Sequence, residues 1–209
     1  MLFKDRIEAG KLLALKLQEE KFPLETIILA IPNGGVIIGK EIKNKFNFSL
    51  DIVVAKKIGA PKNKELAIGA LNGEGNIYID SLLAQKTGTD KNYIQQETIR
   101  LRNEIIAKEN FFRNEKPKID LKGKTLIITD DGVVTGETIK AAVKLVWQAE
   151  PNRVVVATPI ISPEALNNIL SIADEVIYLE CPEIFVSLSD YYQNFAQVSD
   201  IEAKNILNS

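Results

Sequence analysis

Two adjacent aspartates, Asp130 and Asp131, directly follow an apolar run in the sequence. Leu126, Ile127 and Ile128 of that run are consecutive rather than alternating, which is typical of a strand covered on both faces of a parallel sheet. Neighbouring carboxylates repel each other, and each stays ionised only beside water, a metal ion or hydroxyl donors. The pair therefore predicts a polar ligand at the end of a buried strand.

A turn rich in threonine and glycine follows the acids and leads into a helical pattern. Its residues are Val134, Thr135, Gly136, Glu137 and Thr138. Unpaired amides at a helix start lie at the positive end of the helix dipole and favour a phosphate, while the threonines supply hydroxyl donors. The acids would repel phosphate but suit vicinal sugar hydroxyls, because a carboxylate accepts charge-assisted hydrogen bonds from a diol. The whole string predicts a cradle for a ribose 5-phosphate; the alternative is a plain turn in which Thr135 caps the helix.

The elements that must position these residues alternate between strands and helices. This alternation predicts an α/β fold with an open, mostly parallel sheet flanked by helices. In such a sheet, ligands bind beyond the carboxyl ends of the strands, near a topological switch point. We predict strands at 26–31, 50–55, 125–129, 153–160 and 175–180. We predict a first helix from about residue 7 that ends near Pro23, and further helices at about 36–46, after 138 and after Ser162-Pro163.

The middle of the chain has a different pattern. Residues 56–65 are basic and contain glycine and proline, so we predict a loop. Residues 66–71 and 76–80, separated by the turn residues 72–75, predict a small antiparallel hairpin. Residues of about 81–115 predict a helical insertion that packs on a partner or over a site; the alternative is an ordinary surface helix.

Composition narrows the classes of protein and of chemistry. The 209 residues are 45% hydrophobic, so we expect a single domain over residues 1–209, with a small C-terminal hood of about 175–209. The net charge of −2 argues against a nucleic-acid partner, which would favour a basic excess. The chain has no histidine, which excludes imidazole bases, Ser-His-Asp nucleophiles and histidine-ligated metals.

Cellular location follows from similar observations. The single cysteine, Cys181, cannot form an internal disulfide. The first residues, "MLFKDRIEAGKLLALKL", lack the apolar core of a signal peptide, and no apolar run is long enough to span a bilayer. We therefore expect a cytoplasmic protein with no membrane partner.

With these residues, the sequence resembles the type I phosphoribosyltransferases. Their signature is a buried strand, two acids, three variable residues and Thr-Gly-x-Thr/Ser, and "LIITDDGVVTGET" matches it throughout. The resemblance covers most of the chain and is closest to a bacterial branch with a "P-x-GG-V" first loop. It implies that Asp130 and Asp131 bind the 2- and 3-hydroxyls of phosphoribosyl pyrophosphate (PRPP), and that residues 134–138 hold its 5-phosphate.

A loop after the first strand corresponds to the family's pyrophosphate loop. It consists of Pro32, Asn33, Gly34 and Gly35. An oligoanion held by backbone amides requires close approach, which glycine allows; the alternative is an ordinary strand-to-helix turn. Asn33 stands where this branch leads us to expect an arginine. We expect Lys56 and Lys57 to supply the missing charge; the alternative is that both lysines are only solvated.

The implied reaction is displacement at the anomeric carbon of ribose by a nitrogen nucleophile, with pyrophosphate as the leaving group. We expect Lys57 and Asp131 to be catalytic and Mg²⁺ to bridge pyrophosphate and ribose oxygens; no side chain is assigned as a direct metal ligand. Val134 occupies the place of an aspartate in members that act on 6-oxopurines. The acceptor, a base or an amine, therefore stays open.

Residues 178–195 are the expected hood over the acceptor. Phe185, Tyr191 and Tyr192 could stack on a heterocycle there, although core packing is the commoner role of such residues. Two alternative functions stay open besides a PRPP-dependent transferase. The first is a regulatory protein that binds PRPP without catalysis, and the second is a sugar-phosphate hydrolase. A homodimer is a further expectation.

Overall fold

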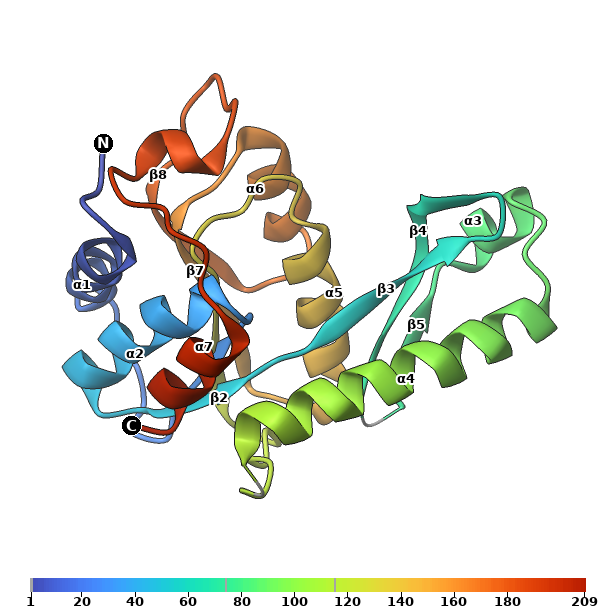
Figure 1. Cartoon of the computed structure of the whole chain (residues 1–209), viewed down its shortest axis with the longest axis horizontal. Coiled ribbons are helices and arrows are strands. Elements are labelled where there is room, and N and C mark those ends of the chain that lie inside the picture. The colour runs from blue at the N-terminus through green and yellow to red at the C-terminus, as the bar shows by residue number, and fades with distance from the viewer. Residues whose placement is uncertain (1, 74, 115) are drawn as a thin grey trace.

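A five-stranded parallel sheet forms the body of the molecule (Figure 1). The computed structural model describes residues 2–73, 75–114 and 116–209. The strand order is β2-β1-β6-β7-β8, and each neighbouring pair is parallel, which confirms the predicted α/β fold with an open sheet. The strands are β1 (Ile27–Ala30), β2 (Ser49–Ile52), β6 (Thr125–Thr129), β7 (Arg153–Ile160) and β8 (Glu175–Glu180).

The strand order reverses between β1 and β6, and this junction is the topological switch point. Ala30 of β1 stands beside Thr129 of β6 in the register of the two strands. The backbone N–H of Ile31 donates to the carbonyl of Thr129 at 2.9 Å. The segments that follow these two strands must therefore emerge side by side.

Helices cover both faces of the sheet. One core cluster joins Leu126 and Ile128 to α5 and α6, and another joins Ile127 to α1 and α2, so β6 is buried on both faces as predicted. Ser162 caps α6 by accepting from the Ala165 N–H at 3.1 Å. The helices are α1 (Arg6–Leu17), α2 (Gly34–Phe46), α5 (Glu137–Val146) with the 3₁₀ turn η1 (Trp147–Ala149), and α6 (Pro163–Leu170).

An arm extends from the body at one side (Figure 1). It contains the antiparallel strands β3 (Ala55–Ala60), β4 (Asn63–Asn72) and β5 (Ile77–Ile79), in the order β3-β4-β5, and the helices α3 (Ser81–Lys86) and α4 (Lys91–Arg113). The predicted hairpin and the helices within 81–115 are confirmed, while residues 74 and 115 lie outside the described chain.

The prediction of a loop over 56–65 is wrong. These residues supply most of β3 and the start of β4, with Lys57 opposite Ala70 and Ile58 opposite Gly69. Ile58 and Ile68 are fully buried under α4, in a core cluster that also contains Ile52 of the body. Burial of these two side chains offsets the low strand propensity of glycine and lysine. Because this cluster joins arm and body, we propose that the chain forms a single domain.

The expected hood of 175–209 is smaller than predicted. Residues 175–180 form β8 of the main sheet, and the unpredicted helix α7 (Asp200–Leu207) packs against α2 and α4. Between them lie the 3₁₀ turn η2 (Leu188–Tyr191) and a segment we call the C-terminal strap, residues 192–200. Among the described residues, no helix combines the length and the apolar character needed to cross a bilayer.

Candidate active site

The acid pair stands at the switch point, directly after the buried strand β6. The carboxylate Oδ1 of Asp130 accepts a hydrogen bond from the Asp131 N–H at 2.8 Å, and its backbone carbonyl accepts from the Thr158 hydroxyl at 3.3 Å. Burial, and then the neighbouring charge of Asp131, raise the pKa of Asp130 well above its ordinary value. The site therefore holds a carboxyl group that is costly to ionise while no ligand is bound.

Asp131 has a partner that sequence reasoning missed. Nε of Arg6, in the first turn of α1, donates to Oδ2 of Asp131 at 2.6 Å. The hydroxyl of Tyr192, in the C-terminal strap, donates to the backbone carbonyl of Asp131, also at 2.6 Å. Side chain and backbone of Asp131 are thus held from two segments at opposite ends of the chain.

The glycine loop, residues 32–35, packs directly against the acids. A Cβ atom on Gly34 would lie 1.9 Å from Asp131 Oδ2, and one on Gly35 would lie 2.9 Å from the Cα of Asp130. Larger side chains do not fit at either position, because real Cβ contacts stay above 3.0 Å. The loop also contains a cis peptide bond between Pro32 and Asn33. The structure therefore brings the two predicted anion and sugar segments into contact.

Asn33 is engaged by the C-terminal strap. Its side-chain N–H group donates to the carbonyl of Val198 and to Oδ1 of Asp200, both at 2.9 Å. Its own Oδ1 and the hydroxyl of the neighbouring Thr129 are buried without a hydrogen-bond partner in the described part of the chain. Asn33 thus connects the glycine loop to the strap, which the sequence did not indicate.

The threonine loop, residues 134–138, ends in the helix start that was predicted. Gly136 has a φ of 76°, a conformation that favours glycine, and α5 begins at Glu137 without a side-chain cap. The hydroxyl of Ser162 donates to the carbonyl of Val134 and ties the loop to α6. Thr135 and Thr138 are exposed, so their hydroxyls are available beside the amides of the first helical turn.

A cleft of about 480 Å³ separates this loop from the base of the arm. Lys56 and Lys57 line one wall, and Thr135 and Thr138 line the other. Lys56 forms an ion pair with Glu104 of α4. The lysines follow the second strand, as predicted, and lie on β3. The cleft that they line contains Thr135 and Thr138 of the threonine loop and none of residues 32–35. The two lysines, the Glu137 side chain and the start of α5 therefore line the same space.

The comparisons with known proteins agree with this geometry. Residues 4–193 match the family model described as "Phosphoribosyl transferase domain". The chain belongs to the phosphoribosyl transferase family. Among curated proteins, it is 31% identical over 207 residues to a protein that two strains of Mycobacterium tuberculosis carry under a provisional name as a phosphoribosyl transferase. The match covers 99% of this chain and 46% of each relative, so the chain spans about half the length of these relatives.

Solved structures show the same fold. The crystal structure of the protein TT1426 from Thermus thermophilus has a TM-score of 0.91 and 35% identity, covering 99% of this chain and 98% of that one. A protein of Neisseria gonorrhoeae with bound ppGpp has a TM-score of 0.51 and 12% identity, covering 100% and 94% of the two chains. The second likeness concerns the fold alone.

In this member of the phosphoribosyl transferase family, the hood aromatics have different surroundings. The rings of Phe185 and Tyr191 are 5.5 Å apart and only partly buried, so they keep accessible surface. Tyr192 differs from the expectation of a stacking residue: its side chain is 4% exposed, its ring packs on Phe3 and Phe195, and its hydroxyl is engaged by Asp131. Tyr192 therefore packs in the core and fixes the backbone of Asp131 by a hydrogen bond.

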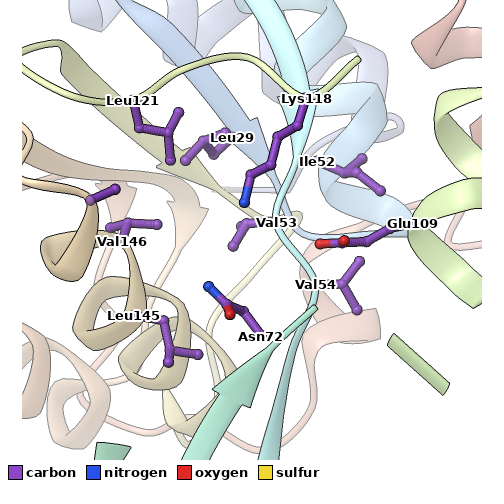
Figure 2. A pocket seen from close by; sticks show the side chains of 11 residues that line it. Leu29, Ile52, Val53, Val54, Asn72, Glu109, Lys118, Leu121, Leu145 and Val146 are labelled. Carbon is purple, nitrogen blue, oxygen red and sulfur yellow. The ribbon is translucent and has the colours of Figure 1, made fainter. Parts of the chain in front are cut away.

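A second, small cavity lies between the sheet and the arm (Figure 2). Asn72, Glu109 and Lys118 direct their polar groups into it from different elements, and apolar side chains form the rest of its wall. Its volume of about 20 Å³ suits roughly one water molecule, which is far too small for a sugar phosphate. This cavity is therefore not a site for a sugar phosphate.

The raised pKa of Asp130 leads to a prediction about stability. The native state disfavours the ionised form of Asp130, so its pKa is higher in the native state than in the unfolded state. Protonated Asp130 therefore contributes its full stabilisation below the unfolded pKa, about 3.9. This stabilisation is lost as the pH rises through the raised native pKa. We expect Asp130→Asn to raise the melting temperature of the unliganded protein at neutral pH, with an advantage that shrinks as pH falls. Thermal unfolding across pH 4–8 measures this.

The control for this prediction is Glu183→Gln, which removes the same charge from an exposed hood residue. Its melting temperature should follow that of the unmodified protein at each pH. An Asp130→Asn variant that is less stable at neutral pH would contradict the assignment of a costly carboxylate at this position.

Proposed function

We propose that the chain is a phosphoribosyltransferase that uses PRPP to transfer a 5-phosphoribosyl group to a nitrogenous base or amine, releasing pyrophosphate. The observation that supports this most directly is the contact between the acid pair and the glycine loop, where Gly34 lies against the Asp131 carboxylate. In PRPP, ribose and pyrophosphate are joined at the anomeric carbon. The groups that bind them must therefore be close neighbours.

Each segment takes one part of PRPP in this proposal. Asp130 and Asp131 accept hydrogen bonds from the 2- and 3-hydroxyls of ribose. The amides and hydroxyls of residues 134–138 bind the 5-phosphate at the start of α5. Residues 32–35 bind pyrophosphate, and Lys56 and Lys57 neutralise phosphoryl charge from across the cleft. Phe185 and Tyr191 are the aromatic surface proposed for the acceptor.

The reaction is a substitution at the anomeric carbon. The bond from this carbon to the pyrophosphate oxygen breaks and its electron pair leaves with pyrophosphate. The acceptor nitrogen then forms the new bond, and its proton passes to water. Positive charge develops on the sugar and negative charge on the leaving group, so the Asp131 carboxylate and Lys57 stabilise opposite ends of the transition state. Asp131 is held in place before the reaction by Arg6 and Tyr192, which keeps its reorganisation small.

Mg²⁺ fits this site as a companion of the substrate. Within residues 2–73, 75–114 and 116–209, no three Asp, Glu, Cys or His side chains are grouped to hold a metal ion. Mg²⁺ commonly binds through substrate phosphates and one or two carboxylates, and Asp130 and Asp131 are the carboxylates beside the glycine loop. When bound, the ion neutralises charge on the leaving pyrophosphate.

A PRPP-binding regulator is the second candidate function. It is favoured by Asn33, because this residue replaces an expected cation and its amide is already engaged by Val198 and Asp200. A regulator needs to bind PRPP but has no requirement for charge stabilisation at the leaving group. Both candidates therefore bind PRPP, but only the transferase converts it to products.

The test measures PRPP binding by calorimetry and pyrophosphate release with Mg²⁺. Adenine, guanine, hypoxanthine, xanthine, uracil, orotate and small amines serve as acceptors, and a reaction without acceptor measures hydrolysis. Binding together with acceptor-dependent release supports the transferase. Binding without release from any acceptor supports the regulator, and the absence of PRPP binding rejects both.

Lys57→Ala separates catalysis from binding. The proposal requires Lys57, which is exposed on the cleft wall opposite the threonine loop, to reach the leaving pyrophosphate when PRPP is bound. We expect turnover to fall by about 10²–10³-fold, the range for loss of one electrostatic group, while PRPP affinity changes much less. Lys62→Ala is the matched control, because it removes a lysine from the β3–β4 turn outside the cleft. Equal losses in turnover and affinity would reject a transition-state role for Lys57.

A further inference from the structure

Arg6 lies where three distant segments meet. Its Nε donates to Asp131 Oδ2 at 2.6 Å, and its Nη1 donates to the carbonyl of Ala196 in the strap at 2.8 Å. The ring of Phe195 lies 3.9 Å from the centre of the guanidinium group. With only 8% of its surface exposed, Arg6 is held in one position by an ion pair, a carbonyl and an aromatic face.

The contact determines how the Asp131 carboxylate is oriented. Arg6 engages Oδ2, the oxygen that also lies against Gly34, and so directs the second oxygen, Oδ1, as the acceptor for a sugar hydroxyl. The bond from Tyr192 fixes the backbone of the same residue. A planar guanidinium held on both sides suits this task better than a flexible ammonium group.

The contact also balances charge. The titratable groups around Asp130 and Asp131 are Arg6 from α1 and Tyr192 from the strap, while residues 32–35 of the glycine loop carry none. Burial and the adjacent carboxylates hold the pKa of Tyr192 above its ordinary range, so the phenol stays neutral. Arg6 is therefore the group that opposes the mutual repulsion of the two acids.

We propose that Arg6 is a positioning residue of the sugar site, which holds the Asp131 carboxylate in one orientation and presents one of its oxygens to the ribose hydroxyls. This inference rests on the proposed function, because it assigns the acid pair to PRPP. Arg6 itself does not touch the reacting atoms. It acts through Asp131, and the strap residues Phe195 and Ala196 hold it there.

The test compares Arg6→Gln, Arg6→Lys and the control Lys11→Ala. Lys11 is an exposed base on the same helix, so its loss changes net charge without touching the site. We expect Arg6→Gln to weaken PRPP binding by about 10- to 100-fold. Because the carboxylate that Arg6 orients serves the sugar, binding of ribose 5-phosphate should weaken by a similar factor, while binding of inorganic pyrophosphate should not change. Arg6→Lys should recover part of the affinity for PRPP and for ribose 5-phosphate.

A measurement without PRPP separates this inference from the proposed function. Carbon NMR of carboxyl-labelled aspartate at one fixed neutral pH reports the surroundings of the Asp131 carboxyl carbon in the unliganded variants, and its resonance should move in Arg6→Gln but not in Lys11→Ala. If the protein does not bind PRPP but the resonance moves, the proposed function fails while the contact of Arg6 with Asp131 stands. An unchanged Asp131 resonance, or equal losses of affinity for ribose 5-phosphate and for pyrophosphate, would overturn the positioning role. Should Arg6→Gln not fold, the comparison of Arg6→Lys with the unmodified protein decides by the same criteria.

Discussion

Replacing Arg113 with alanine is expected to lower the free energy of unfolding by about 3–5 kcal/mol, the cost of leaving a buried charge without its partner. Arg113 lies at the end of α4, where its Nε contacts both carboxylate oxygens of Asp51 at 3.0 and 3.2 Å. Its Nη1 is 3.2 Å from Glu109, and its Nη2 donates to the Ile52 carbonyl.

All three ionic partners are deeply buried. Asp51 is 5% exposed, and Glu109 and Arg113 are each 9% exposed. The alanine variant would leave two buried carboxylates without this cation and would remove the ionic contact between α4 and β2. Urea unfolding measures the change, and a lower midpoint at constant slope identifies it as a loss of native-state stability.

Arg100 on the same helix is the matched control. It pairs with Glu97 at 2.7 Å and with Glu104 at 2.6 Å, but its side chain is 55% exposed. Exposed pairs of this kind contribute only about 0.2–1 kcal/mol. Arg100→Ala should therefore cost under about 1 kcal/mol, and a similar cost for both variants would reject burial as the reason that Arg113 matters.

Gly34→Ala is expected to reduce PRPP affinity by about a hundredfold or more, since a displacement of roughly 1 Å in a binding group has effects of this size. The added methyl group would lie 1.9 Å from Oδ2 and 2.4 Å from Cγ of Asp131. Asp131 cannot move away freely, because Arg6 holds its side chain and Tyr192 holds its carbonyl. The substitution therefore displaces the sugar-binding carboxylate or the glycine loop itself.

Gly88→Ala is the control for this prediction. Gly88 lies between α3 and α4, and nothing lies within 4 Å of a Cβ added there. Its φ of +68° makes alanine cost about 1–2 kcal/mol in stability, but the site is untouched. Calorimetry should show unchanged PRPP affinity for Gly88→Ala. Unchanged affinity for Gly34→Ala would contradict the placement of the sugar beside the glycine loop.

The sequence alone determined the sheet and the segments that line its edge. Consecutive apolar residues predicted β6, and the acids and the Thr/Gly turn after it predicted the chemistry of the loop, because both signals lie within one short stretch. Local sequence signals also explain why the helices that begin at residues 34, 137 and 163 were predicted correctly. Burial on both faces of a strand leaves a pattern that needs no knowledge of its neighbours.

The tertiary structure decided which groups serve the acids. Arg6 and Asp131 are separated by 125 positions in the chain, and Tyr192 and Asp131 by 61, so no local pattern joins them. Residues 56–65 form strands because Ile58 and Ile68 are buried under α4. The stabilisation from this burial exists only once the arm has folded. The sequence predicts the type and the approximate place of a polar side chain. The partner and the charge state of that side chain depend on desolvation and on contacts between segments that only folding brings together.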